Sequence, residues 1–196
     1  MKILIDNGHG VETKGKCSPD GSLREYSYTR EIARRIVQAL TAEGFDAERI
    51  VTEEEDISLR ERCRRVNALC RSLGSKNVLL VSVHNNAAGS GGQWLTARGF
   101  TAHVSLNASD RSKRLAKCLW QAALDNGLRG NRSVPYEMYK AQNLAMCRDT
   151  LCAAVLTENL FQDNREDVAF LLSEEGKQAV TAAHVQGIKT FIKQNQ

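Results

Sequence analysis

The segment NVLLVSVH, residues 77–84, decides the fold, because its aliphatic and β-branched run predicts a strand buried on both faces. A strand covered on both faces belongs at the centre of a largely parallel sheet. Apolar segments at 2–7 and 153–158 predict two further buried strands, and the segments 45–51 and 99–105 predict additional ones. The expected sheet therefore has about five to six strands.

Helical periodicity fills the intervals between these strands. Helices are expected at 25–43, 59–73, 110–126, 165–172 and 174–194, with a shorter one around 141–149 in the irregular region 128–150. Ser58 and Glu61 form a capping-box pattern, in which each side chain satisfies a backbone donor at the start of a helix. Because strand and helix alternate without repeat, linker or low-complexity tract, residues 1–196 are expected to fold as a single α/β domain. Its sheet is twisted and mostly parallel, with helices on both faces.

Composition and charge exclude several classes of protein. The 196 residues carry a net charge of +4, and no stretch interleaves basic with stacking aromatic residues, so no nucleic-acid partner is expected. No apolar run approaches the roughly 20 residues of a membrane span. Met1 and Lys2 lead through three apolar residues to Asp6, too short a core for an export signal. We therefore expect a monomer made in the cytoplasm without a membrane span.

The six cysteines lack CxxC spacing and lack the histidine neighbours of a structural zinc site. Three of them, Cys63, Cys70 and Cys118, fall on apolar faces of expected helices. Buried, reduced thiols are therefore expected, and a Cys147–Cys152 disulfide is the less favoured alternative.

Ionisable residues stand where the apolar segments end. His9, His84 and Glu158 each close an apolar segment, and Glu25 opens the helix at 25–43. The carboxyl ends of parallel strands meet in a crevice that binds ligands. Two imidazoles and a carboxylate leave a fourth position on zinc for a water, whose pKa the metal lowers to about 7, and a spare carboxylate can act as a base. The pattern therefore predicts a catalytic zinc site.

Each of these residues also has a structural interpretation when taken alone. His9 could cap a glycine turn, and His84 could be a hydrogen-bonded histidine at a strand end. Glu25 could be a helix-start carboxylate that interacts favourably with the helix dipole. Glu158 is harder to explain in this way, because an unpaired carboxylate is costly to bury. The other histidines and several loop carboxylates are expected to be structural or solvated: His103, His184, Glu12, Asp20 and Glu137.

Taken in order, the motifs resemble those of the zinc-dependent N-acetylmuramoyl-L-alanine amidases of the type 3 family. That family has a D-x-G-H-G turn, a glutamate that opens the first helix, an S-x-H-x-N strand end and a late P-x-x-L-x-E-x-x-F-x-x-N segment. The matching segments are DNGHG at 6–10, Glu25, SVHNN at 82–86 and AAVLTENLFQDN at 153–164, with SLRER at 58–62, VN at 66–67 and RGF at 98–100. Ala153 replaces the usual proline. The resemblance spans nearly the whole chain.

The resemblance implies that His9, Glu25 and His84 bind Zn²⁺ and that Glu158 is the catalytic carboxylate. It also implies the substrate, peptidoglycan, which is cleaved between the lactyl group of N-acetylmuramic acid and the L-alanine of the stem peptide. Such a hydrolase acts on the cell wall as a lysin or autolysin, released by lysis or another export route. No separate cell-wall-binding domain is expected within residues 1–196.

Substrate contacts are expected in the loops 10–24, 85–97 and 128–143, because zinc does not itself select an amide. Side chains that could contact the substrate or support the metal ligands are Asn85, Asn86, Arg129, Arg132 and Arg148. Two alternatives stay open: a zinc peptidase or deacylase that cleaves a different amide on a related fold, and a catalytically silent wall-binding module. The presence of all four chemical residues argues against the silent module.

Overall fold

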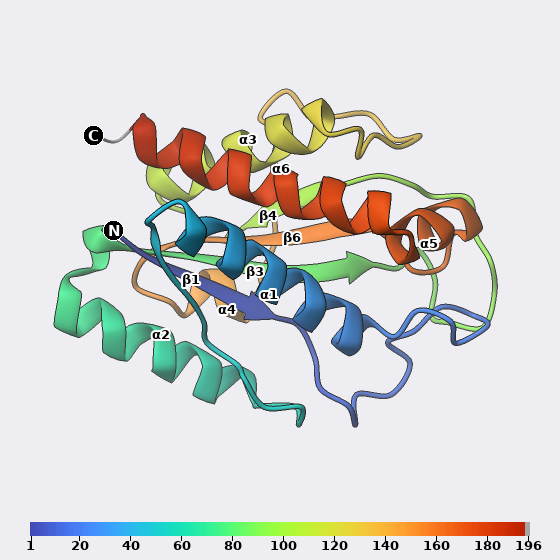
Figure 1. Cartoon of the computed structure of the whole chain (residues 1–196), viewed down its shortest axis with the longest axis horizontal. Helices are drawn as coiled ribbons and strands as arrows, with labels where there is room; N and C mark the ends of the chain where they lie inside the picture. The colour runs from blue at the N-terminus through green and yellow to red at the C-terminus, as the bar shows by residue number, and fades with distance from the viewer. Residues whose placement is uncertain (195–196) are drawn as a thin grey trace.

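The computed structural model describes residues 1–194 and contains one six-stranded sheet in the order β2-β1-β3-β6-β4-β5 (Figure 1). The strands are β1 (Lys2–Asn7), β2 (Asp46–Arg49), β3 (Val78–Asn86), β4 (Thr101–Val104), β5 (Lys140–Ala141) and β6 (Ala153–Phe161). The helices are α1 (Glu25–Ala42), α2 (Leu59–Leu73), the 3₁₀ turn η1 (Ser75–Asn77), α3 (Asp110–Asp125), α4 (Ala145–Arg148), α5 (Arg165–Leu172) and α6 (Glu174–Lys193). None of these helices within residues 1–194 is long and apolar enough to cross a bilayer.

Strand β3 occupies the centre of the sheet, as the sequence predicts. It pairs in parallel with β1 on one side and with β6 on the other. β2 pairs in parallel with β1, and only the β4–β6 pair among the described strands is antiparallel. The carboxyl ends of β1, β3 and β6 therefore lie at one end of the sheet, on the right in Figure 1. This topology brings together three segments that are far apart in the sequence.

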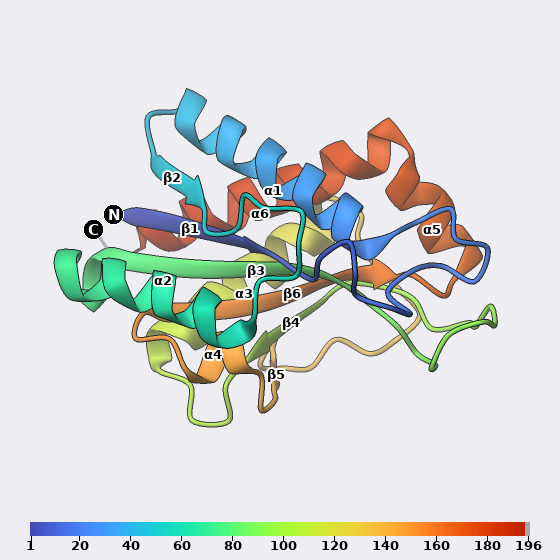
Figure 2. The same ribbon diagram turned by 90° about the horizontal axis from the view of Figure 1, so that it is seen from below.

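Helices cover both faces of the sheet, with α1 and α6 on one side and α2 and α4 on the other (Figure 2). The first side, where α3 also packs, buries Ile5 and Val81 completely. The second side buries Leu4 and Leu80. Because successive side chains of a strand point to opposite faces, each central strand serves both cores. This is why the sequence of β3 is apolar almost throughout.

The carboxyl ends of β3 and β6 differ from the prediction. β3 continues past His84 to Asn86, and β6 continues past Glu158 to Phe161. A bulge between His84 and Asn86 shifts the register, and Leu160 adopts a left-handed backbone with φ of 62°. Glu158 is therefore an interior strand residue rather than a strand tip.

The capping box at the start of α2 forms only by half. Ser58 Oγ accepts a hydrogen bond of 3.3 Å from the backbone N–H of Glu61. The Glu61 carboxylate does not reach back to Ser58; it pairs with Arg64 and Arg65 on the helix surface. Charge pairing along the helix thus replaces the second half of the box.

All six cysteines are unpaired thiols, and no bond joins Cys147 to Cys152. Cys63 and Cys70 are buried in the core beneath α2, in agreement with the helical pattern. Cys17 and Cys118 are only partly buried, so the expectation of burial is wrong for these two.

Candidate metal centre

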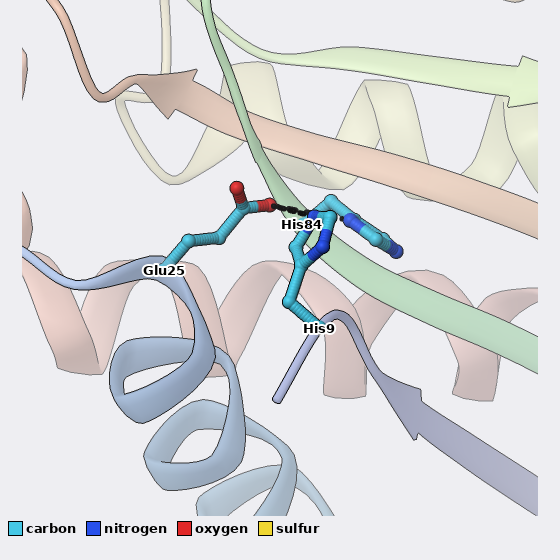
Figure 3. Close-up of side chains that lie close together, drawn as sticks. All are labelled: His9, Glu25 and His84. Atoms are coloured by element: carbon cyan, nitrogen blue, oxygen red, sulfur yellow. Dashed lines mark hydrogen bonds and ion pairs between the residues drawn. The ribbon is translucent and has the colours of Figure 1, made fainter. Parts of the chain in front are cut away.

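Three side chains converge at the carboxyl ends of β1 and β3 (Figure 3). His9 follows β1, Glu25 opens α1, and His84 lies on β3. Glu25 Oε1 lies 3.3 Å from His9 Nε2 and 3.2 Å from His84 Nδ1. The two imidazole rings meet edge to face with their centroids 5.0 Å apart. One possible ligand atom from each residue therefore lies within 4.8 Å of the others.

The DNGHG turn gives His9 its position. A Cβ atom on Gly8 would lie 2.2 Å from the His84 ring, so only glycine allows the turn to approach that ring. His9 has φ of 63°, a left-handed conformation that is about 1–2 kcal/mol less favourable for a residue with a side chain. In this conformation the His9 side chain lies against Glu25 and His84 (Figure 3).

Glu25 is the buried acceptor at the centre of the group, with 1% of its side chain exposed. Its Oε1 also accepts a 2.9 Å hydrogen bond from the backbone N–H of Asn85. Its Oε2 is buried and has no hydrogen-bond partner in residues 1–194. Burial alone would raise the pKa of Glu25, but hydrogen bonds and charge from His84 and His9 hold that pKa below its usual range. The carboxylate is therefore ionised.

These residues fit a zinc ion by the chemistry of their donors. Two imidazole nitrogens and one carboxylate oxygen are a set that catalytic zinc sites use, with a position left for water. Glu25 Oε2 has no hydrogen-bond partner in residues 1–194, so this buried oxygen is available to a metal ion. The backbone donor of Asn85 fixes the orientation of Glu25, as outer hydrogen bonds do around metal ligands.

Glu158 lies beside this group without being part of it. It is the register partner of His84 on the neighbouring strand, so both side chains point to the same face of the sheet. Burial raises the pKa of Glu158 to about 7; the negative charge of Glu25 adds to this shift, while His84 and Lys16 oppose it. Its Oε2 is buried and lacks a partner within the described part of the chain. A carboxyl group with a pKa near neutrality can both accept and donate a proton.

The asparagines that follow His84 support the backbone. Asn85 Nδ2 donates to the carbonyl oxygen of Asn159 at 2.6 Å, and the side chain is buried. Asn86 Oδ1 accepts from the backbone N–H of Ala87 at 2.9 Å. The backbone N–H of Asn85 thus donates to Glu25, while the Asn85 side chain is buried.

The three arginines proposed as substrate contacts are not brought together. Arg129 and Arg132 are exposed on the loop after α3, and Arg132 lies over the Phe161 ring with 5.6 Å to its centroid. Arg148 pairs with Asp149 at 2.6 Å and lines a different pocket, beside Ser75 and the start of β6. Only Arg132 is thus tied to the carboxyl end of β6.

A pocket of about 260 Å³ opens beside the two histidines. Its other wall is the segment before and at the start of α2, a region outside the three loops expected to line the site. The lining residues are Asp6, Gly8, His9, Asp56, Ile57, Ser58, Leu59, Arg62 and His84. The sequence signal for this wall was present in the SLRER motif, because Ser58, Leu59 and Arg62 all belong to it.

The remaining histidines differ from each other. His184 is fully buried and both ring nitrogens are bonded, to Thr157 Oγ1 and to the carbonyl oxygen of Val180. His103 Nε2 contacts Thr101 Oγ1 at 2.8 Å, while its buried Nδ1 has no hydrogen-bond partner in residues 1–194. Burial lowers the pKa of both to about 4. Neither joins the group around Glu25.

The family model described as N-acetylmuramoyl-L-alanine amidase matches residues 3–190. The endolysin of Bacillus phage SPP1 is 28% identical over 192 residues, covering 97% of this chain and 65% of that protein. The probable cell wall amidase LytH of Staphylococcus epidermidis is 28% identical over 191 residues, covering 96% of this chain and 57% of that protein. The chain thus spans less than two thirds of the length of these relatives.

Solved structures share the fold. The N-acetylmuramoyl-L-alanine amidase from Clostridium difficile 630 superposes with a TM-score of 0.83 at 24% identity, covering 100% of this chain and 98% of that one. The amidase Ami1 from Mycobacterium smegmatis gives 0.83 at 22% identity, covering 99% and 97%. This chain therefore has the fold of these proteins.

Proposed function

Because this chain belongs to the N-acetylmuramoyl-L-alanine amidase family, we propose that it hydrolyses the amide between N-acetylmuramic acid and L-alanine in peptidoglycan, as a zinc-dependent enzyme of the cell wall. The observation that carries the proposal is the convergence of His9, Glu25 and His84 beside Glu158, whose Oε2 has no hydrogen-bond partner in residues 1–194. The endolysin and cell wall amidase relatives support the choice of the wall as the site of action.

His9, Glu25 and His84 would hold the zinc ion. When bound, zinc supplies a Lewis acid for the amide carbonyl and lowers the pKa of a water in the open position. Glu25 is suited to this role because it is ionised and nearly inaccessible to bulk water. The protein then needs only to position the substrate amide and to move protons.

Glu158 would perform the proton transfers. As a carboxylate it takes a proton from the attacking water, and as a carboxylic acid it hands that proton to the amine that leaves with L-alanine. A pKa near 7 suits both halves of this cycle, since neither protonation state is strongly disfavoured at neutral pH. Its position opposite His84 in the strand register supports a place at the reacting bond.

The substrate would reach the site along the outer end of the sheet. The pocket beside His9 and His84 is walled by Asp56, Ser58 and Leu59, and Leu59 is 56% exposed. On the other side, Asp163 Oδ2 accepts hydrogen bonds from the backbone of Ala88 and Gly89 and holds the loop after β3. A peptide attached to a glycan strand would lie between these two segments.

Digestion of purified peptidoglycan followed by mass spectrometry tests the proposal. The expected products are intact glycan and peptides with a free N-terminal L-alanine, with loss of activity in chelator and recovery on adding zinc. Peptides that begin with another residue would instead identify a zinc peptidase. Binding to the wall without any product would identify a silent module.

A further inference from the structure

Arg62 on α2 belongs to the SLRER motif, yet the proposed chemistry does not use it. Its side chain is 2% exposed, although it carries a charge. Nη1 donates to Asp6 Oδ1 at 2.8 Å and to the carbonyl oxygen of Asn7 at 2.5 Å, and Nη2 donates to the carbonyl oxygen of His9 at 3.0 Å. One planar guanidinium group therefore fixes three acceptors around the DNGHG turn.

Asp6 extends this contact to the strand that carries His84. The carboxylate is 1% exposed, and its Oδ2 accepts a 2.5 Å hydrogen bond from Ser82 Oγ. Asp6 and Ser82 are register partners on β1 and β3, and His84 follows Ser82 on the same face of β3. The chain of contacts from Arg62 through Asp6 to Ser82 thus reaches both segments that end in a histidine of the metal centre.

The backbone of His9 needs such a restraint. Its φ of 63° is unfavourable for a residue with a side chain and persists only where the surroundings impose it. The His9 carbonyl oxygen accepts from two guanidinium groups, since Arg30 Nη1 also donates to it at 3.0 Å. Arg30 also donates to the backbone carbonyl oxygen of Glu53 but makes no hydrogen bond to Asp6 within residues 1–194. Of these two arginines, Arg62 is therefore the one that connects His9 with β3.

Stability by itself is a poor reason for this arrangement, because the desolvation of a buried ion pair offsets most of its attraction. We infer that Arg62 is a positioning residue that holds His9, and through Asp6 and Ser82 also His84, in the geometry that binds the metal. The inference rests on the proposed function, because it assigns zinc to these histidines. It adds a role for α2, which contributes no ligand.

Zinc affinity, measured by competition with a chromogenic chelator, tests the inference on the full chain. Arg62→Lys keeps the charge beside Asp6 but cannot span the same acceptors, and we expect zinc to bind about 10–100-fold more weakly. Ser82→Ala removes only the hydrogen bond to Asp6 and should lose about tenfold. If Arg62→Lys does not fold, the zinc affinity of Ser82→Ala tests the inference.

Arg98→Lys is the matched control, because Arg98 also binds a buried aspartate, Asp167 at 2.9 Å, but has no hydrogen bond to the DNGHG turn. It should lower thermal stability and leave zinc affinity unchanged. Wild-type affinity in folded Arg62→Lys and Ser82→Ala, with zinc bound by the parent protein, would overturn the inference and leave the proposed function intact. Failure of the parent protein to bind zinc would instead overturn the proposed function.

Discussion

The core beneath α6 and the metal centre on the opposite face differ in how their buried polar groups are paired. Two neighbouring residues of β6 show the difference, because Thr157 faces the core and Glu158 lies beside the metal centre. Thr157 Oγ1 lies 2.9 Å from His184 Nε2, and His184 Nδ1 lies 2.8 Å from the carbonyl oxygen of Val180. Burial keeps this imidazole neutral, and both of its nitrogens are satisfied. Glu158 points to the other face and keeps a buried Oε2 without a partner in residues 1–194.

At the metal centre the unpartnered buried atoms include carboxylate oxygens, which are atoms that a metal ion or a substrate could bind. A buried polar atom without a partner costs about 1–3 kcal/mol, so folding gives no reason to retain it. Glu25 Oε2 is another such atom at the same end of the sheet. His184 can therefore be changed at the expense of stability alone, whereas changes at Glu158 should affect chemistry first.

The largest expected effect is on turnover by Glu158→Gln. The amide keeps the size of the side chain but cannot take a proton from water, so kcat should fall by about 10²–10⁴. Zinc content and the far-ultraviolet circular dichroism spectrum should match the parent protein. Near-normal turnover would mean that another group is the base, and Glu137 would be examined next.

The same variant should be more stable than the parent at high pH when zinc is removed. The pKa of Glu158 is about 7 in the folded chain, against an ordinary value of 4.5, so the folded state retains a proton that the unfolded state releases. The protonated Glu158 therefore contributes to the free energy of unfolding in full below pH 4.5, and this contribution is lost as pH rises through 7. The loss amounts to about 3 kcal/mol by about pH 8.

Urea unfolding of the two proteins in chelator, from acid to alkaline pH, measures this effect. Between pH 4.5 and about pH 8, the free energy of unfolding of the parent should fall by about 3 kcal/mol more than that of Glu158→Gln. Parallel pH profiles would show that the carboxyl group is not held in its neutral form.

His184→Ala is the converse test on the other face. It removes both hydrogen bonds of the imidazole and leaves Thr157 Oγ1 without its partner, so the free energy of unfolding should fall by about 1–3 kcal/mol. Zinc content and kcat of the folded fraction should be unchanged. A loss of zinc in this variant, with the fold intact, would break the distinction between the two faces.

Much of the fold could be predicted because its signals are local. The apolar run at 78–83 specifies a central strand whatever surrounds it, and the glycines around His9 specify a turn at the end of β1. Three residues of the site, His9, His84 and Glu158, stand out because ionisable groups rarely follow such runs, whereas Glu25 stands at the start of a helix. Their alignment with one family supplied the division between metal ligands and the base.

Other features depend on contacts between distant segments. The register shift past His84 places an extra residue in β6, and no periodicity in either strand reveals it. The network of Arg62, Asp6 and Ser82 joins three elements, so each residue alone resembles an ordinary polar position. Arg148 lies apart from the site, in a pocket beside Ser75 and the start of β6. The irregular region before β6 has no periodic pattern from which this position could be predicted.

The metal itself gives the most direct test of the account. Elemental analysis and zinc X-ray absorption of protein purified without added metal should find one zinc per chain, bound by nitrogen and oxygen ligands that include two imidazoles. His84→Ala should contain little or none. Sulfur ligands from any of the six cysteines, or full zinc occupancy in His84→Ala, would contradict the assignment of the metal to His9, Glu25 and His84.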